Sequence, residues 1–354
     1  MREIPMRRIV ARTHWTTQTI DGSGRAGLDR NENCDRGLRQ IITEKFLRPL
    51  DVDVLIRYPD LRLAYLSLAK ITQLPADRLL LTSGSEQAIR SFLYAHSPLK
   101  MGDSHQRRLV YPDPTYAMVQ VYGRLFGYEL QALPYSYCHS ERRFSIDTSA
   151  FLTCRDRDVV YLPSPDNLTG TVYETELVER ICAAGCRVLI DHAYIDFAAP
   201  PIGSTQVELV DRYPNLSITR SFSKVGGVAG MRLGYLYSNS DNINRYYEDK
   251  PMYEISGISC AYLAFLADAK ALLDGTVSEI RAGKLEIEKC LQRKGAILVP
   301  SFGNFAVFEE NDEIFEPLRA VALLRPFEID GKRFIRVTAP DSGSVRSILE
   351  GYDD

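Results

Sequence analysis

Residues 220–235 read Arg220-Ser221-Phe222-Ser223-Lys224-Val225-Gly226-Gly227-Val228-Ala229-Gly230-Met231-Arg232-Leu233-Gly234-Tyr235. Two hydroxyl side chains, Ser221 and Ser223, come just before Lys224, and Arg232 follows eight positions after that lysine. A lysine amine can bond covalently to a carbonyl carbon, and hydroxyls with a guanidinium suit a phosphate dianion. The glycines let the backbone approach a ligand closely. A serine- and glycine-rich surface loop with a solvated lysine would contain the same residue types, so the rest of the chain decides between the two interpretations.

Short, nearly continuous apolar runs alternate with helix-like segments on both sides of this stretch. The runs are residues 79–81, 108–111, 159–162, 188–190 and 216–219. Such runs are typical of strands buried on both faces of a parallel sheet. Apolar residues recur at spacings of three and four in residues 85–93, which predicts a helix after the first strand. The repeated order from about residue 79 to 237 predicts an α/β layered domain.

The pattern changes after about residue 250. A long helical region, Ile258 to Arg293, precedes two apolar runs at residues 296–299 and 305–308, which indicates a smaller α+β unit. Residues 1 to about 40 lack a complete core of their own and are expected to fold back onto this unit. The predicted division is a large domain of residues 41–250 and a small domain of residues 1–40 plus 251–354.

Composition indicates a globular protein that acts on small molecules. The 354 residues are 45% hydrophobic, and 43 basic residues mix with 46 acidic ones to give a net charge of -3. This balance does not favour nucleic acid as a partner. No apolar run is long enough for a membrane span, and the basic start is not followed by the apolar part of a secretory signal, so we expect a cytoplasmic protein. The seven cysteines and five histidines have no metal-site spacing, so no metal is expected.

The segment around Lys224 resembles the lysine signature of the fold-type I, class I/II aminotransferases. Matching motifs follow in order from about residue 28 to 338 and resemble in particular the histidinol-phosphate aminotransferase branch. The resemblance implies that Lys224 holds pyridoxal 5'-phosphate (PLP) as an internal aldimine, and that Ser221, Ser223 and Arg232 hold the cofactor phosphate. It also implies a fold-type I architecture, α/β in class. In that fold the large domain is built on a mostly parallel seven-stranded sheet and stands beside a smaller α+β domain.

A second motif, Leu189-Ile190-Asp191-His192-Ala193-Tyr194, resembles the family's Asp-Glu-Ala-Tyr segment. The resemblance implies that Asp191 faces the pyridine nitrogen and keeps it protonated, and that Tyr194 hydrogen-bonds the ring hydroxyl oxygen. An isolated aspartate after a strand more often caps a helix, but the spacing from Lys224 favours the cofactor role. His192 stands where glutamate is usual, and we expect its effect to lie behind the site.

Two loops complete the implied cofactor contacts. Residues 162–170, Leu162-Pro163-Ser164-Pro165-Asp166-Asn167-Leu168-Thr169-Gly170, resemble a Pro-Asn-Asn-Pro-Thr-Gly loop, in which Asn167 binds the ring hydroxyl. Leu168 replaces the usual proline and Asp166 an asparagine, so the loop is expected to be less rigid or differently shaped, and a plain turn is the alternative.

Residues 82–88 match a glycine-containing phosphate loop at a strand-to-helix transition. Gly84, Ser85 and Glu86 are the implied phosphate-binding residues, with backbone N–H groups at the helix start facing the phosphate. Ser83 and Glu86 also have the spacing of a capping box, which is compatible with that role.

Two tyrosines have implied roles at the cofactor. Tyr116, in Tyr111-Pro112-Asp113-Pro114-Thr115-Tyr116, would stack on the pyridine ring. Tyr58, in Arg57-Tyr58-Pro59-Asp60, would reach the phosphate in the neighbouring subunit's site, which implies a homodimer. A tyrosine in a loop before proline is the alternative for Tyr58.

Three residues are implied at the substrate. Arg336 matches the arginine that binds the substrate carboxylate, for which a bidentate guanidinium suits better than a lysine. Arg325 is a candidate for the distal group of the substrate, and Asn31 for a lid over it. Ala339 follows Thr338 where Gly-Thr is usual.

The implied reaction is PLP-dependent transfer of an amino group between an amino acid, or an amino-phosphate compound, and a keto acid. The same residues also serve decarboxylation, elimination and cyclisation, so a PLP-dependent decarboxylase or an amino-acid cyclase or lyase is an alternative. A catalytically silent PLP-binding protein is another. Departures from the family pattern argue against histidinol phosphate itself as the substrate; they are Cys34, Asp166, Leu168, His192 and Ala339.

Overall fold

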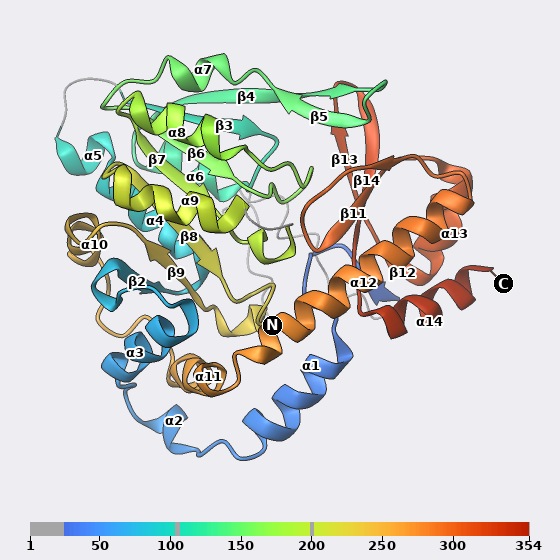
Figure 1. Ribbon diagram of the computed structural model, residues 1–354, viewed down its shortest axis with the longest axis horizontal. Coiled ribbons are helices and arrows are strands. Elements are labelled where there is room, and N and C mark those ends of the chain that lie inside the picture. The colour runs from blue at the N-terminus through green and yellow to red at the C-terminus, as the bar shows by residue number, and fades with distance from the viewer. Residues whose placement is uncertain (1–24, 103–106, 199–201, 354) are drawn as a thin grey trace, which may run out of the picture.

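A computed structural model describes residues 25–102, 107–198 and 202–353 of the chain. Within these ranges the strands form one sheet of eight strands, one of four and one of two. Figure 1 shows the large sheet and its helices on one side of the molecule and the four-stranded sheet on the other.

The large sheet has the strand order β2-β9-β8-β7-β6-β3-β4-β5. Neighbours from β8 to β4 are parallel, whereas β9 and β5 pair antiparallel with their neighbours. The strands are β2 (Leu79–Thr82), β3 (Arg108–Asp113), β4 (Glu129–Cys138), β5 (Arg143–Ile146), β6 (Val159–Pro163), β7 (Arg187–Asp191), β8 (Leu216–Ser221) and β9 (Gly234–Tyr237). The predicted mostly parallel sheet is confirmed, with eight strands rather than seven because the β4–β5 hairpin adds an antiparallel edge strand.

Alternate residues of each central strand enter two different cores. In β6, Val160 packs in the core on one face of the sheet, while Val159 and Tyr161 pack in the core on the other. Every residue of β6 is buried, as the continuous apolar run predicts for a strand covered on both faces.

Helices cover both faces of the large sheet (Figure 1). The helices packed in the first core are α1 (Arg36–Ile41), which continues as a π-helical turn (Ile42–Leu47), α3 (Leu61–Thr72), α8 (Thr175–Ala183), α9 (Ile202–Arg212) and α11 (Gly257–Asp268). Those in the second core are α4 (Gly84–Ala95), α6 (Met118–Leu125) and α10 (Ser240–Tyr247). Short helices are α2 (Asp53–Ile56), α5 (Pro98–Met101) and α7 (Ser149–Leu152), with 3-10 turns at Ala76–Arg78, Ile195–Phe197 and Ala229–Met231.

The four-stranded sheet is antiparallel, in the order β10-β11-β14-β13. Its strands are β10 (Leu298–Val299), β11 (Phe305–Glu309), β13 (Arg325–Ile329) and β14 (Lys332–Thr338), and its helices are α12 (Ala271–Arg293), α13 (Asp312–Val321) and α14 (Ser342–Asp353). Near the N-terminus, β1 (Ala26–Gly27) pairs with β12 (Ala322–Leu323), and Leu28 enters the core of this unit. Residues 1–24 of the predicted fold-back lie outside the described residues. The domain boundaries at residues 40 and 250 stay a prediction.

The region expected as one long helix, residues 258–293, is two helices. Ala269 leaves the helical conformation between α11 and α12. The break separates a helix in the core of the large sheet, α11, from α12, which runs to the small sheet (Figure 1).

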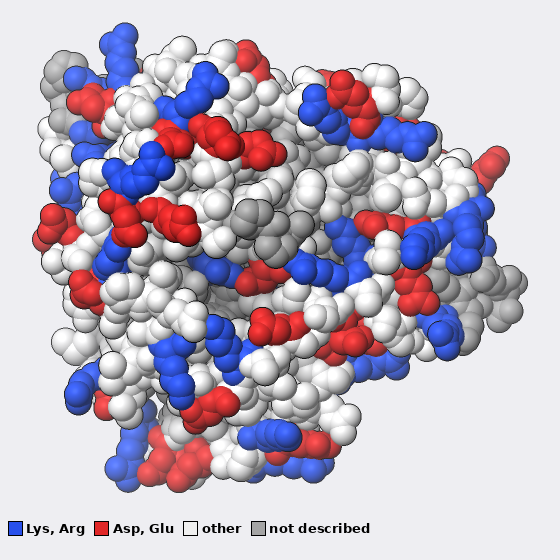
Figure 2. Space-filling model, in the orientation of Figure 1, with Lys and Arg blue, Asp and Glu red and all other residues white. Residues whose placement is uncertain are grey.

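Two surface properties can be stated for the described residues. No helix among them is both long enough and apolar enough to cross a membrane. Figure 2 shows basic and acidic side chains interspersed over the face in view, in agreement with the small net charge.

Gly283 marks a close contact between α12 and the turn before α14. A Cβ there would lie 1.9 Å from the carbonyl oxygen of Pro340, which is backbone and cannot rotate away. We therefore predict that Gly283→Ala lowers the free energy of unfolding by about 1–3 kcal/mol, although alanine is the better helix former. Gly275→Ala, on the same helix, is the control: its Cβ would meet no described atom within 4 Å. It should raise stability by up to about 1 kcal/mol. Denaturant unfolding of both variants checks this, and equal effects would contradict the packing argument.

Candidate active site

Lys224 lies half-buried in the turn that follows β8. Its Nζ donates to the carbonyl oxygen of Arg30 at 3.1 Å and lies 5.6 Å from the ring centroid of Tyr194. Ser221 and Ser223 are buried just before it, and the Ser221 hydroxyl accepts a hydrogen bond from the Ser223 N–H at 3.0 Å. The turn is therefore ordered by its own serine, and the lysine amine faces the site.

Asp191 ends β7 and is buried. Its Oδ2 accepts from the Tyr161 hydroxyl at 2.8 Å and its Oδ1 from the Ala193 N–H at 3.0 Å. Burial raises the pKa of Asp191 to about 6, while the hydrogen bond from Tyr161 opposes that rise. Both partners are neutral, so the carboxylate is suited to a cationic ligand atom.

Sequence reasoning missed Tyr161. It is one of 20 tyrosines, in the middle of a buried strand, where packing is the ordinary explanation. In the pairing of β6 with β7, Tyr161 lies opposite Leu189, two residues before Asp191, and its hydroxyl reaches the carboxylate of Asp191. The contact between Tyr161 and Asp191 cannot be recognised without knowing that β6 and β7 pair.

Asn167 lies in the loop after β6, next to the loop of Asp191. The Ser164 N–H at the start of this loop donates to the carbonyl oxygen of Asp191 at 2.9 Å. The Oδ1 atom of Asn167 is buried without a hydrogen-bond partner among the described residues. Asp166, the departure from the family pattern, accepts from the N–H groups of Leu168 and Thr169. The Asp166 carboxylate thus orders the loop that lacks the usual proline.

Asn31 is fully buried and joins the two sheets. Its amide Nδ2 donates to the Tyr194 hydroxyl and to the carbonyl oxygen of Asn167, both at 3.3 Å. Its backbone N–H donates to Oγ1 of Thr338, at the end of β14, at 2.9 Å. The carbonyl oxygen of Asn31 accepts from Nδ2 of Asn304 at 3.1 Å. Asn31 therefore holds Tyr194 in place.

Arg336 comes from β14 and is buried over the ring of Phe305, with its guanidinium carbon 5.4 Å from the ring centroid. Its Nη1 and Nη2 donate to the carbonyl oxygens of Asn167 and Asp29. Its Nε is buried with no partner among the described residues. Burial lowers the pKa of Arg336 to about 10, so the side chain stays cationic at neutral pH. Arg325 is its register partner on β13.

Two glycines allow close packing at the start of α4. A Cβ on Gly84, which has a positive φ of 74°, would come within 2.7 Å of Nη2 of Arg232. A Cβ on Gly234 would lie 2.7 Å from the N atom of Ser85. The backbone of Ser85 and the guanidinium of Arg232 thus lie close together because both positions are glycine.

The capping-box expectation at this helix start was wrong. Gln87 rather than Glu86 accepts from the N–H of Ser83. Glu86 accepts from the Tyr122 hydroxyl at 2.9 Å and lies 3.9 Å from Nη2 of Arg232. The Glu86 side chain is therefore turned toward Arg232 and does not cap the N-terminus of α4.

The two tyrosines expected at the cofactor differ in environment. Tyr116 packs beside the second core, and burial and Glu86 raise the pKa of its hydroxyl. Tyr58 is 79% exposed and stacks on Tyr253, with ring centroids 4.4 Å apart. The structure therefore places Tyr58 at the surface of the chain.

His192 faces away from the residues above. Its Nε2 pairs with Oε1 of Gln206 on α9 at 2.7 Å, and burial lowers the pKa of His192 to about 4, so the ring is neutral. Gln206 in turn donates to the carbonyl oxygen of Tyr173. This position agrees with the expectation that the change from glutamate to His192 acts behind the site.

The sequence model of the family described as aminotransferase class I and II matches residues 53–348. The chain belongs to this aminotransferase family. A relative, the histidinol-phosphate aminotransferase of Symbiobacterium thermophilum, is 33% identical over 268 residues, which cover 73% of this chain and 70% of the relative.

Solved structures share the fold of this aminotransferase-family chain. The histidinol-phosphate aminotransferase from Sinorhizobium meliloti in complex with PLP has a TM-score of 0.73 at 18% identity, covering 93% of this chain and 91% of that one. L-threonine-O-3-phosphate decarboxylase from Porphyromonas gingivalis has a TM-score of 0.68 at 17% identity, covering 90% and 97%.

The raised pKa of Asp191 makes the stability of the cofactor-free protein depend on pH. The native pKa of about 6 exceeds the ordinary value of 3.8, so the native state binds more protons than the unfolded state between these values. We predict that the stability of the natural protein relative to Asp191→Asn falls as pH rises from about 4 to 6, by up to about 1.4 kcal/mol per pH unit, and is flat above. Urea unfolding across this pH range measures the difference.

Tyr161→Phe is the companion variant. It removes the hydrogen bond that lowers the pKa of Asp191, so the pH at which the fall ends should move upward. Parallel stability curves for the natural protein and Asp191→Asn would show that Asp191 does not titrate in this way.

Proposed function

We propose that this chain is a PLP-dependent aminotransferase whose cofactor lies among Lys224, Asp191 and Asn167. The observation that carries the proposal is a pair of buried acceptors on neighbouring loops: the carboxylate of Asp191, with neutral partners only, and the unpartnered Oδ1 of Asn167. A protonated ring nitrogen suits the first and a ring hydroxyl suits the second. When bound, PLP supplies an aldehyde that condenses with amines and a ring that withdraws electrons from the amino acid's α-carbon.

Each residue has a proposed role that follows from its chemistry. Asp191, whose carboxylate is desolvated, would pair with a protonated ring nitrogen, and Tyr161 orients that carboxylate. Tyr194 and Asn167 would bind the ring hydroxyl oxygen, and Tyr116 would stack on the ring. Lys224 would hold the cofactor covalently through Nζ, and the same amine would serve as the base for the proton on the substrate's α-carbon.

The phosphate would be held at the start of α4, where Gly84 and Gly234 let the backbone of Ser85 and the guanidinium of Arg232 come close. Ser221, Ser223 and Arg232 supply hydroxyls and a guanidinium, and Gly84, Ser85 and Glu86 form the start of α4, where free N–H groups favour an anion.

Arg336 would bind the substrate carboxylate. Two of its nitrogens are held by backbone carbonyl oxygens, which fixes the plane of the guanidinium and leaves Nε for a ligand. Arg325 would take the distal group. Asn31, expected as a lid, is instead fixed in the interior by its bonds to Thr338 and Tyr194, so its role would be to hold Tyr194 in place. The proposed substrates are an amino acid, or an amino-phosphate compound, and a keto acid.

We also propose that the protein is a homodimer in which Tyr58 reaches the partner's phosphate. Large apolar side chains on α2, α3 and the segment before α11 are exposed in the single chain, and such a patch is typical of an interface. The patch consists of Val52, Leu55, Ile56, Tyr58, Leu63, Leu66, Met252 and Tyr253.

Lys224→Ala tests the lysine assignment. The variant should lose the visible absorption of bound cofactor and at least about 10³-fold of turnover, because both the covalent attachment and the general base are removed. Lys70→Ala is the control, since Lys70 is exposed and pairs with Asp268 at the surface. Retained absorption with intact turnover in Lys224→Ala would contradict the assignment of Lys224.

Incubating the PLP-loaded protein with a panel of amino acids distinguishes transamination from the alternative functions. Transamination should leave the cofactor in its amine form and release a keto acid. Release of carbon dioxide with the aldehyde form restored would instead indicate the decarboxylase alternative, and the absence of any spectral change would favour a silent cofactor-binding protein.

The dimer is tested with Ile56→Asp, which places a charge in the middle of the apolar patch. Sedimentation velocity should show the natural chain at twice its monomer mass and the variant shifted toward the monomer. Leu285→Asp is the matched control, because Leu285 is a similarly exposed leucine on α12, outside the patch. A natural chain that sediments as a monomer would contradict the proposal.

A further inference from the structure

A second cavity lies at the opposite end of the large sheet from Lys224. It has a volume of about 290 Å³ and is lined by His96, Met101, Arg107, Asp156, Arg157, Arg187 and Arg245. Four of these residues are arginines and one is an aspartate.

The strand directions explain why the arginines gather there. Arg107 directly precedes β3, Arg157 comes two residues before β6, and Arg187 is the first residue of β7. Since these strands are parallel, their amino ends meet at one edge. Asp191 is the last residue of β7, so the cavity and the candidate active site are separated by about 13 Å along that strand alone.

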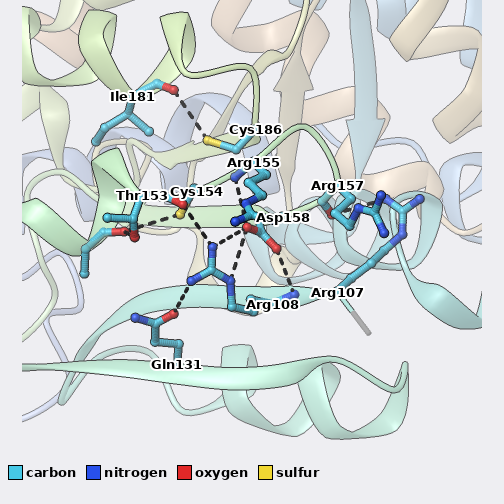
Figure 3. A network of polar contacts seen from close by, with 11 residues as sticks. Arg107, Arg108, Gln131, Thr153, Cys154, Arg155, Arg157, Asp158, Ile181 and Cys186 are labelled. Carbon is cyan, nitrogen blue, oxygen red and sulfur yellow. Dashed lines mark hydrogen bonds and ion pairs between the residues drawn. The ribbon is translucent and has the colours of Figure 1, made fainter. Parts of the chain in front are cut away.

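Asp158, a buried carboxylate next to Arg157 in the sequence, is already used by another arginine. Asp158 accepts from Nε and Nη2 of Arg108 at 3.2 and 2.5 Å, and from the N–H groups of Arg108 and Arg155. Figure 3 shows Arg108 turned toward Asp158, whereas Arg107 and Arg157 lie together to one side. Asp158 therefore does not neutralise the cavity.

Three of the cavity arginines have no carboxylate partner in the described ranges. In the described part of the chain, the guanidiniums of Arg157, Arg187 and Arg245 form no ion pair. Nη1 of Arg107 donates to the carbonyl oxygen of Arg157 at 3.2 Å, which fixes the position of Arg107. Like charges held this close repel one another, and an anion between them relieves that repulsion.

His96 forms a neutral part of the wall. It is 2% exposed and its Nε2 pairs with the Tyr246 hydroxyl at 3.1 Å. Burial and, to a smaller extent, the charges of Arg187, Arg245 and Arg107 together lower the pKa of His96 to about 3. The same three guanidiniums thus give the cavity a positive field.

We propose that this cavity binds a compact phosphate-bearing anion, with Arg157, Arg187 and Arg245 as its ligands. The guanidinium fork matches phosphate oxygens and forms charge-assisted hydrogen bonds with them. A volume of about 290 Å³ is at the lower limit for small-molecule sites, so a pyrophosphate-sized group fits better than a nucleotide. The site does not depend on the proposed aminotransferase function.

Calorimetric titration of the PLP-saturated protein with pyrophosphate, at fixed ionic strength, tests the proposal. PLP saturation keeps the candidate active site filled. We expect one pyrophosphate per chain, and an affinity at least about tenfold weaker in Arg187→Gln/Arg245→Gln, since each charged hydrogen bond contributes about 1.5–3 kcal/mol. The control is Arg124→Gln/Arg180→Gln, which removes two exposed arginines from α6 and α8 outside the cavity and should change affinity less than about twofold.

Three results would overturn the site. They are no binding at millimolar pyrophosphate, an equal loss of affinity in both double variants, and binding that disappears when PLP saturates the protein. If the cavity double variant does not fold, Arg157→Gln alone replaces it, because Arg157 is exposed. That variant should weaken binding at least about threefold, and unchanged affinity would contradict the proposal.

Discussion

Asn31 belongs to the N-terminal part of the chain. Its buried amide links that part to the small sheet and to the loops of the large sheet. A buried amide is costly unless its polar atoms are paired, and Asn31 uses both its side chain and its backbone. Its φ of 54° lies in the left-handed region, which asparagine tolerates better than most residues. Because the same side chain contacts Tyr194 and the carbonyl oxygen of Asn167, the geometry of the site depends on how the two sheets are joined.

The parallel sheet separates two kinds of chemistry. Its carboxyl ends carry Asp191 and the loops with Asn167 and Lys224, where buried acceptors and an amine meet. Its amino ends carry Arg107 and Arg187, where cations meet. Strand direction alone produces this division, since side chains at equivalent strand ends are brought to the same edge.

The sequence predicted the fold best where one physical signal dominated. The central strands are continuous apolar runs because both faces are covered, and β6 and β7 lie where those runs were. The β4–β5 hairpin was not predicted, because β4 is half exposed and its apolar content is diluted by polar residues. The break between α11 and α12 was missed for another reason: it depends on which core each helix joins. For the site, motifs found Lys224 and its companions, but the contact of Tyr161 with Asp191 needs the register of two strands.

The central claim is that Lys224 is the residue to which the cofactor attaches. Borohydride reduction of the PLP-loaded protein, followed by proteolysis and peptide mass spectrometry, tests it directly and does not depend on knowing the substrate. The account predicts one pyridoxyl group per chain, on the peptide that contains Lys224. A stoichiometric label on another lysine, or none on any peptide, would contradict it.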